Sequence, residues 1–274
     1  ADYGVTGSVV ECKSDPSKYQ PALVEAAESN DVVVAVGWQF WDVLTAVVPQ
    51  MPDTLFVFVD NGLEGVGDNL LSIVYAENEG SFLAGYAAMK ISATQSVGFV
   101  GGEDSATINN FFVGYKQGAL YANPQGTVLD PVYVGDYESP DKGKEFANTL
   151  YGKGADVVFA VAGKTGLGVF EAAKEQNKFA IGVDSDQKYI DPEHIICSMK
   201  KDIGGSIYTA IGNYIDDGVF AGGTVWNADM TSGFVGLGYG DDTMTQQVTA
   251  EVKADVEALA QKIIAGEIVV ETTR

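Results

Sequence analysis

The feature of this sequence that most restricts its fold is a regular alternation between short apolar runs and longer segments with helical spacing. Runs rich in Val, Ile and Phe favour buried strands, and the segments between them have apolar residues on one helical face. This alternation is typical of βαβ units with a parallel sheet. The predicted strands cover 8–12, 32–36, 55–59, 71–75, 97–100, 128–133, 157–161, 179–183 and 194–199, and the predicted helices cover 19–29, 42–48, 81–91, 110–121, 142–151, 166–175, 203–215 and a last amphipathic segment with Val252, Val256, Leu259 and Ile263 on one face.

The length indicates how these units are grouped. About nine strands in 274 residues fit two doubly wound sheets better than one. A closed barrel of eight βα units is the alternative, but the helix lengths and a hairpin-like stretch over 224–240 fit it poorly.

Charge and hydropathy exclude several kinds of partner. The 16 basic and 38 acidic residues give a net charge of −22, so the surface repels phosphate backbones and no nucleic-acid partner is expected. No apolar run reaches the length of roughly 18 residues that a membrane-spanning helix needs. The chain opens with Ala1-Asp2-Tyr3-Gly4, and we expect that any targeting segment has been cut away.

The residues that usually carry catalysis or bind metals are scarce. The single histidine, His194, is expected on the surface or in a turn, and Cys12 and Cys197 are expected to be buried thiols, so no metal site is predicted. The segment Gly163-Lys164-Thr165 is similar to the end of a P-loop, but position 158 is Val where that motif needs Gly. The sequence also has no Gly-x-Ser-x-Gly elbow and no dinucleotide-binding glycine pattern, so we predict no catalytic residue and no cofactor.

Polar residues instead follow the predicted strands. Ligands of open α/β sheets bind beyond the carboxyl ends of the strands, where such residues converge. Each position alone is also explained as a helix cap. Together, however, carboxylates that accept hydroxyl hydrogen bonds and aromatic faces that stack on a planar ligand favour a small-molecule site. The segments are 37–40, 60–61, 101–104, 163–166 and 184–186, with 77–79 at the start of a helix.

Four segments carry a resemblance to a known family. They are Ser81-Phe82-Leu83-Ala84-Gly85-Tyr86, Val97-Gly98-Phe99-Val100-Gly101-Gly102, Ala162-Gly163-Lys164-Thr165-Gly166-Leu167-Gly168 and Ile181-Gly182-Val183-Asp184-Ser185-Asp186-Gln187. In this order and spacing the chain resembles the basic membrane protein family, the purine-nucleoside-receptor-like lipoproteins that serve ABC transporters. The resemblance implies a type I periplasmic-binding-protein fold, an α/β architecture in which two doubly wound parallel-sheet lobes joined by a hinge hold a nucleoside in a cleft.

The resemblance also implies boundaries and roles. One lobe would hold 1–76 and about 199–221, the other 77–198 and about 222–245, and 246–274 would form a C-terminal helix and tail. Asp184 would accept the ribose hydroxyls, and Lys201 would face it from the opposite lobe. The ring of Trp38 would stack on the base, with ordinary core packing as the alternative. The full predicted ligand-binding set is Asp184, Lys201, Trp38, Phe40, Asp60, Glu77, Asn78, Gly163, Lys164 and Asp186.

Two departures from the family pattern affect these expectations. The family begins with a strand and an Asp-x-Ser-Phe-Asn helix start that contacts the ligand, and this sequence has neither, so we expect its first lobe to lack the first strand. Lys164 stands where the family has a small residue. A cation there would reach a carboxylate or phosphate, which leaves the identity of the ligand within the nucleoside class open.

The expected function is therefore that of a receptor, not an enzyme. It would capture a purine nucleoside and deliver it to an ABC-transporter permease, outside the cytoplasm in the periplasm or at the cell surface, with a lipid anchor that lies outside this chain. One alternative is an enzyme acting on nucleosides or sugars with Asp184 and Asp186 as acid and base, although residues two apart at a strand end point to opposite sides. Another is a ligand-sensing receptor in signalling.

Overall fold

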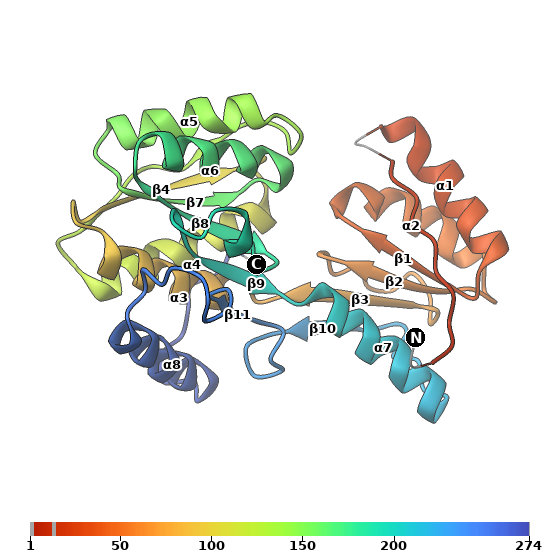
Figure 1. Ribbon diagram of the computed structural model, residues 1–274. Helices are drawn as coiled ribbons and strands as arrows, with labels where there is room; N and C mark the ends of the chain where they lie inside the picture. The colour runs from red at the N-terminus through yellow and green to blue at the C-terminus, as the bar shows by residue number, and fades with distance from the viewer. Residues whose placement is uncertain (1–2, 13–14, 274) are drawn as a thin grey trace. The chain divides into compact units, whose positions relative to one another are not determined.

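The computed structural model describes residues 3–12 and 15–273. The chain forms two compact α/β units, and each is discontinuous in sequence. The first unit comprises Ala1–Tyr75 and Ile203–Ala228, and the second comprises Ala76–Asp202 and Asp229–Arg274 (Figure 1). Both are built on largely parallel sheets, which confirms the fold class predicted from the βα alternation.

The first unit has a four-stranded sheet. Its strands are β1 (Val32–Val36), β2 (Leu55–Val59), β3 (Leu70–Tyr75) and β10 (Val225–Ala228), in that order across the sheet and all parallel. Helices α1 (Pro16–Ser29) and α2 (Trp41–Val47) cover one face, and α7 (Ile203–Asp217) lies on the other (Figure 1).

The core of the first unit lies between its sheet and the α1/α2 pair. Alternate residues of β1, Val33 and Ala35, point into this core and are buried, whereas Val36 at the end of the strand is 48% exposed. This is the pattern of an edge strand with one covered face. No further strand pairs with the outer edge of β1 among the residues that the structure describes.

The strand predicted over 8–12 is wrong. Residues 4–12 have no regular structure, Val9 is 89% exposed, and Cys12 is only partly buried, not the buried thiol that we expected. A strand is stable only when its backbone pairs and one face packs. In this structure residues 8–12 have neither strand pairing nor a packed face, although their composition is apolar.

The second unit has a seven-stranded sheet in the order β11-β9-β8-β7-β4-β5, with β6 also paired to β4. All pairs are parallel except β9 with β11. The strands are β4 (Ser96–Gly101), β5 (Thr127–Val128), β6 (Val132–Tyr133), β7 (Val157–Val161), β8 (Phe179–Asp184), β9 (Ile195–Lys201) and β11 (Val235–Gly238). The stretch 224–240 is thus not the expected hairpin, because β10 and β11 belong to different sheets.

Helices cover both faces of the second sheet. On one face lie α3 (Glu77–Ile91) and α4 (Ala106–Ala122), and on the other lie α5 (Pro140–Gly152) and α6 (Gly166–Glu175), while α8 (Ala250–Ile264) packs against α3 (Figure 1). The α3 and α4 backbones touch. A Cβ on Gly114 would lie 2.1 Å from the carbonyl oxygen of Asn78, and one on Gly118 would lie 1.8 Å from that of Phe82. Only glycine permits this approach, which fixes the start of α3 against α4.

Candidate ligand-binding site

The site begins at the carboxyl edge of the second sheet, with Asp184. This residue ends β8 with φ at +64°, in the left-handed region that costs a residue with a Cβ of the order of 1 kcal/mol. Asp60, directly after β2 in the first unit, is left-handed too, with φ at +79°. Strained residues of this kind concentrate at functional sites.

Asp184 is paired with Lys201, the last residue of the neighbouring strand β9. The Lys201 Nζ lies 3.4 Å from Asp184 Oδ1, and the exposed fractions of the two side chains are 5% and 47%. Asp184 Oδ1 is buried without a hydrogen-bond partner among the described residues, so the pair is an ion contact and not a hydrogen bond. Lys201 Nζ also lies 5.6 Å from the centroid of the Phe111 ring.

This geometry corrects one expectation. Lys201 does not face Asp184 from the opposite lobe, because both residues belong to the second unit and their strands are neighbours. A buried ammonium needs a counter-charge, and Asp184 provides it while its side chain remains about half exposed. The Asp184 carboxylate is therefore held by the buried Lys201 ammonium and is still accessible to a ligand.

Asp186 has different contacts. Its Oδ2 accepts a hydrogen bond from the Gly240 N–H at 2.8 Å, and its Oδ1 accepts one from the Lys188 N–H at 3.2 Å. The bond from Gly240 ties the turn after β8 to the loop after β11, and the bond from Lys188 lies within that turn. Asp186 is thus engaged within the protein on both carboxylate oxygens.

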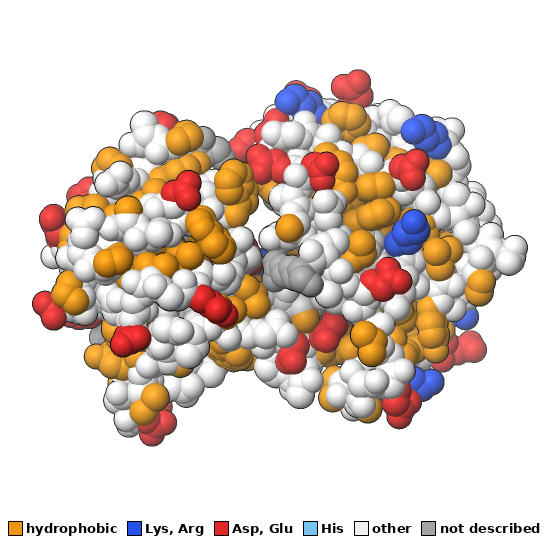
Figure 2. All heavy atoms as spheres, turned by 180° about the vertical axis from the view of Figure 1, so that it is seen from behind, with side chains coloured by type: hydrophobic (Ala, Val, Ile, Leu, Met, Phe, Trp, Pro, Cys, Tyr) orange, Lys and Arg blue, Asp and Glu red, His pale blue; other side chains and the backbone are white. Residues whose placement is uncertain are grey.

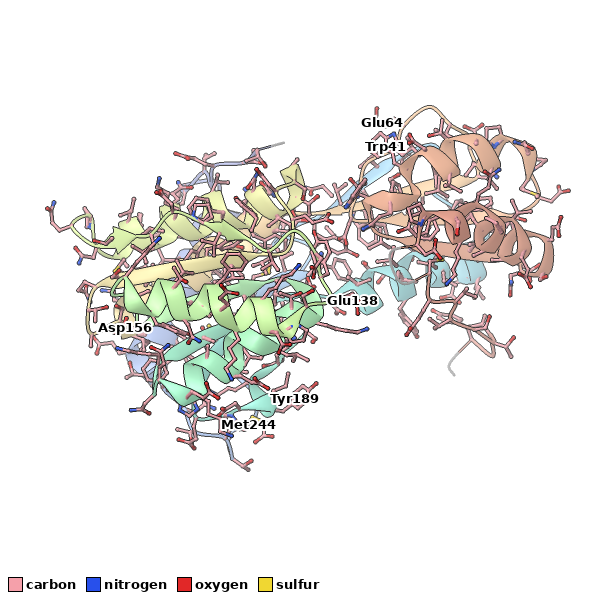
Figure 3. The ribbon with its side chains drawn as sticks, turned by 90° about the horizontal axis from the view of Figure 1, so that it is seen from above. Trp41, Glu64, Glu138, Asp156, Tyr189 and Met244 are labelled. Carbon is pink, nitrogen blue, oxygen red and sulfur yellow. The ribbon has the colours of Figure 1, made fainter. Side chains whose placement is uncertain are left out.

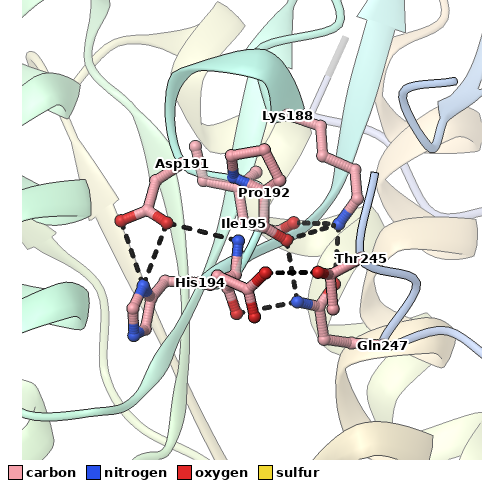
Figure 4. A network of polar contacts seen from close by, with 8 residues as sticks. Lys188, Asp191, Pro192, His194, Ile195, Thr245 and Gln247 are labelled. Atoms are coloured by element: carbon pink, nitrogen blue, oxygen red, sulfur yellow. Dashed lines mark hydrogen bonds and ion pairs between the residues drawn. The ribbon is translucent and has the colours of Figure 1, made fainter. Parts of the chain in front are cut away.

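Lys188 and its neighbours strengthen the same connection (Figure 4). Lys188 is fully buried, and its Nζ donates to the Ile195 carbonyl at 2.5 Å and to Gln247 Oε1 at 2.6 Å. Burial lowers the pKa of this lysine. His194 Nδ1 lies 3.0 Å from the Asp191 carboxylate in this turn. The network therefore holds the loop over 240–248 in place.

Two glycines and a tyrosine shape the strand ends beside Asp184. A Cβ on Gly102, after β4, would lie 2.2 Å from the Tyr137 ring. Gly163, after β7, has φ at +55°, and a Cβ there would lie 3.3 Å from Tyr137. Tyr137 therefore fills the space between these two strand ends. Sequence reasoning missed it, although the Gly101-Gly102 pair signals that a side chain approaches the backbone closely.

Lys164 follows Gly163 on an exposed turn. Its Nζ lies 3.0 Å from the carboxylate of Glu138, which is labelled in Figure 3, and the two side chains are 63% and 53% exposed. Such a pair contributes little to stability, because water screens it. Lys164 therefore has an acidic partner within the second unit.

Glu77 and Asn78 start α3 and are both buried. Asn110 of α4, which sequence reasoning also missed, donates from Nδ2 to Glu77 Oε2 at 2.9 Å. No local motif marks Asn110. Only the contact between α3 and α4 brings it to the carboxylate.

The remaining predicted residues belong to the first unit. Trp38 and Phe40 form a short 3-10 helix after β1, preceded by Gly37 with φ at +102°. The Trp38 ring is 49% exposed, which differs from ordinary core packing, whereas the Phe40 ring lies 5.2 Å from that of Tyr19. Trp38 thus offers an exposed aromatic face, whereas Phe40 packs against Tyr19 of α1.

Residues 5–274 match the sequence model of the family described as ABC transporter substrate-binding protein, PnrA-like. The chain belongs to this family. It is 33% identical to basic membrane protein A1 of Borrelia garinii subsp. bavariensis over 245 residues, which cover 88% of this chain and 71% of that protein. The resemblance stated from the four sequence segments is thereby confirmed.

Solved structures of solute-binding proteins are similar to this substrate-binding protein. An ABC transporter solute-binding protein from Aeropyrum pernix K1 superposes with a TM-score of 0.83 at 26% identity, covering 94% of this chain and 82% of that one. A periplasmic ribose ABC transporter protein from Conexibacter woesei, with a TM-score of 0.58 at 16% identity over 77% of this chain and 76% of that one, shares the fold. Both have the type I periplasmic-binding-protein fold predicted above.

Within residues 3–12 and 15–273, no group of three or more His, Cys, Asp or Glu side chains is arranged to hold a metal ion. Burial raises the pKa of Cys197 to about 12, so this thiol is not a nucleophile at neutral pH. No helix in the described part of the chain has the length and hydropathy needed to cross a bilayer.

Proposed function

We propose that this substrate-binding protein captures a purine nucleoside and delivers it to the permease of an ABC importer. The observation that carries the proposal is the Asp184–Lys201 pair: a half-exposed carboxylate at a strand end, held by a lysine that is 5% exposed. A carboxylate in this position accepts two hydroxyl hydrogen bonds from a ribose, each charge-assisted and contributing roughly 1.5 to 3 kcal/mol. Lys201 supplies the counter-charge that holds this carboxylate at the strand end.

Other side chains fit a nucleoside in supporting roles. Trp38 and Tyr137 are the aromatic residues that we assign to the base, Trp38 because its ring is exposed and Tyr137 because it lies at the strand ends next to Gly163. Phe40, Asp60, Asn78 and Glu77 complete the proposed set. Lys164 already has Glu138 as a partner, which favours a neutral nucleoside over a nucleotide.

Family membership supports the cellular setting. A substrate-binding protein of an ABC importer works outside the cytoplasm, and the relatives named basic membrane proteins suggest attachment to a membrane surface. We propose a lipid anchor, an ABC permease as the partner, and binding without turnover. The carboxylates that the enzyme alternative needs as an acid and base have separate environments, since Asp186 is occupied by Gly240 and Lys188.

A titration of guanosine, inosine and adenosine against the full chain, followed by thermal unfolding and calorimetry, tests the proposal. A ligand that binds only the native state raises its melting temperature. Free ribose and amino acids are the comparison ligands. A shift with ribose but with no nucleoside contradicts the nucleoside assignment, and release of free base in proportion to protein concentration contradicts binding without turnover.

Asp184→Ala is the residue test. We expect affinity for the nucleoside to fall at least about tenfold, or roughly 1.4 kcal/mol. Asp130→Ala, which removes an exposed carboxylate of the same unit, is the matched control and should bind normally. An unchanged affinity in Asp184→Ala would mean that the ribose contact lies elsewhere.

A further inference from the structure

The C-terminal segment of the second unit, residues 269–273, is held along α4 by side-chain amides, and we call it the strap. Gln117 of α4 binds the strap with both polar atoms of its side-chain amide. Its Nε2 donates to the Val269 carbonyl at 3.1 Å, and its Oε1 accepts from the Glu271 N–H at 2.7 Å. This two-sided arrangement reproduces the hydrogen bonding that a neighbouring strand would give. The strap is therefore bound as an extended peptide.

The strap continues toward the start of α4, where it reaches Asn110. The Thr273 side chain donates to the Ala106 carbonyl at 2.9 Å. Asn110 Oδ1 accepts from Thr272 Oγ1 at 2.8 Å and from the Thr273 N–H at 3.3 Å. A peptide N–H can only donate, so it requires the oxygen of the Asn110 amide to face the strap. The strap thus determines which way this buried amide points.

The strap also orients the Asn78 amide, but here the nitrogen and not the oxygen faces the strap. Its Nδ2 donates to the carbonyls of Val270 and Glu271 at 3.3 and 3.1 Å. Carbonyl oxygens only accept, so the Asn78 amide turns its nitrogen to the strap and its oxygen inward. That oxygen lies 3.5 Å from Asn110 Nδ2.

These two orientations converge on Glu77. With its oxygen on the strap, Asn110 has its nitrogen 2.9 Å from Glu77 Oε2. Glu77 is 0% exposed, and a buried carboxylate is costly unless donors surround it. The reversed amide would place an oxygen against the carboxylate and repel it. Because Gly114 and Gly118 hold α3 against α4, Glu77 cannot move away from Asn110 to relieve this repulsion.

We propose that Asn110 is a positioning residue of the ligand site and that the strap keeps its amide directed at Glu77. The inference rests on the proposed function only in that Glu77 and Asn78 belong to the nucleoside site. Val269 at the start of the strap is 80% exposed, whereas the next residue, Val270, is 8% exposed and belongs to the buried hydrophobic residues. A change in the strap, which lies outside the sheet, therefore alters the surroundings of the buried Glu77 carboxylate through the Asn110 amide.

Two substitutions at Thr273 isolate the decisive N–H group. Thr273→Val removes the hydroxyl bond to Ala106 but keeps the N–H, and Thr273→Pro removes both. In the full chain without ligand, we expect the Glu79 and Gly80 amides at the start of α3 to exchange hydrogen about tenfold faster in Thr273→Pro than in Thr273→Val. Equal exchange rates in the two variants would overturn the coupling between strap and helix.

Asn110→Asp tests the positioning role directly. It retains an oxygen for the strap but removes the NH2 group that faces Glu77. We expect the Thr273 amide to remain protected from exchange while guanosine affinity falls at least tenfold. Asn148→Asp on α5, which introduces the same charge at a partly exposed position, should bind normally. Normal binding by Asn110→Asp would refute the positioning role.

The two measurements also separate this inference from the proposed function. If the unmodified protein binds no nucleoside, the nucleoside assignment fails, and the exchange comparison at Thr273 still decides whether the strap controls the start of α3. If nucleosides bind but exchange at α3 is the same in both Thr273 variants, the inference fails and the assignment stands.

Discussion

The strands of the parallel sheets are buried to different extents in the two units. In the second unit both faces carry a helix pair, and every residue of β4 and β7 is buried. In the first unit β1 is an edge strand with Val36 48% exposed. Hydrophobic side chains are visible on the surfaces of both units in Figure 2, so the contrast lies in the edge strand. The same βα alternation therefore yields a closed core in one unit and a partly open one in the other.

This difference teaches that apolar sequence alone does not determine burial. The β1 residues Val32–Val36 are as apolar as those of β7, Val157–Val161. However, β7 has β4 and β8 as neighbours, whereas within the described part of the chain β1 pairs with β2 alone. A strand gains most of its stability from cross-strand pairs and from the helices on its faces. Equivalent substitutions should therefore cost more in the second unit.

The largest expected effect is that of removing an aromatic ring from the second core. Phe159 of β7 is fully buried and lies 5.3 Å from the Tyr115 ring and 5.6 Å from the Phe99 ring. Phe159→Ala should lower the free energy of unfolding by about 3 to 5 kcal/mol, because it leaves a cavity. Trp41→Ala in the first unit, where the ring is 40% exposed and labelled in Figure 3, should cost about 1 to 2 kcal/mol. Urea unfolding of both variants measures this, and equal costs would break the comparison.

Acid should lower the stability of the second unit through Asp136. In the second unit, hydrogen bonds from Lys142, Ser139 and the Glu138 N–H lower the pKa of Asp136 from 3.8 to about 2. A carboxyl with a lowered pKa stabilises the fold above its unfolded value, and this contribution disappears as the pH falls from 3.8 toward about 2.

Asp136→Asn tests this contribution of Asp136 to stability in acid. This variant should lose less stability than the unmodified chain over the same pH interval, as followed by urea unfolding at each pH. In the first unit, Asp15 has its pKa lowered mainly by the Ser17 hydroxyl and N–H, so Asp15→Asn should act in the same direction. Identical pH curves for Asp136→Asn and the unmodified chain would contradict the assignment.

The smallest expected effect is at the open strand. Val36→Thr places a hydroxyl on a half-exposed position and should change the free energy of unfolding by no more than about 0.5 kcal/mol. Val158→Thr buries the same hydroxyl in β7, where Val158 is fully buried, and should cost about 1 to 3 kcal/mol. A large effect at Val36 would show that its side chain is covered in solution.

The sequence allowed much of the fold to be predicted, because helical and strand periodicities are local. The predictions that failed all depend on tertiary contacts. Residues 8–12 have strand-like composition but pair with no strand among the residues that the structure covers. The 224–240 segment was interpreted as a hairpin, although its two strands join different sheets. No local pattern reports which sheet a short strand will join.

The candidate site shows the same limit. Asp184 was identified because a polar residue directly after an apolar run is visible in the sequence. The position of Lys201 beside it was not, because it depends on β8 and β9 being neighbours. Tyr137 and Asn110 were missed for a related reason, since each reaches the site from a different element through a glycine contact or a helix contact.

The division of each unit into two stretches of sequence has a consequence for synthesis on the ribosome. The first unit lacks α7 and β10 until residues 203–228 have been made, and by then every strand of the second sheet except β11 has already been translated. Domains usually fold in the order in which they are made. Here the earliest residues must wait for a late segment, so the unit that begins the chain is completed only after most of the other has left the ribosome.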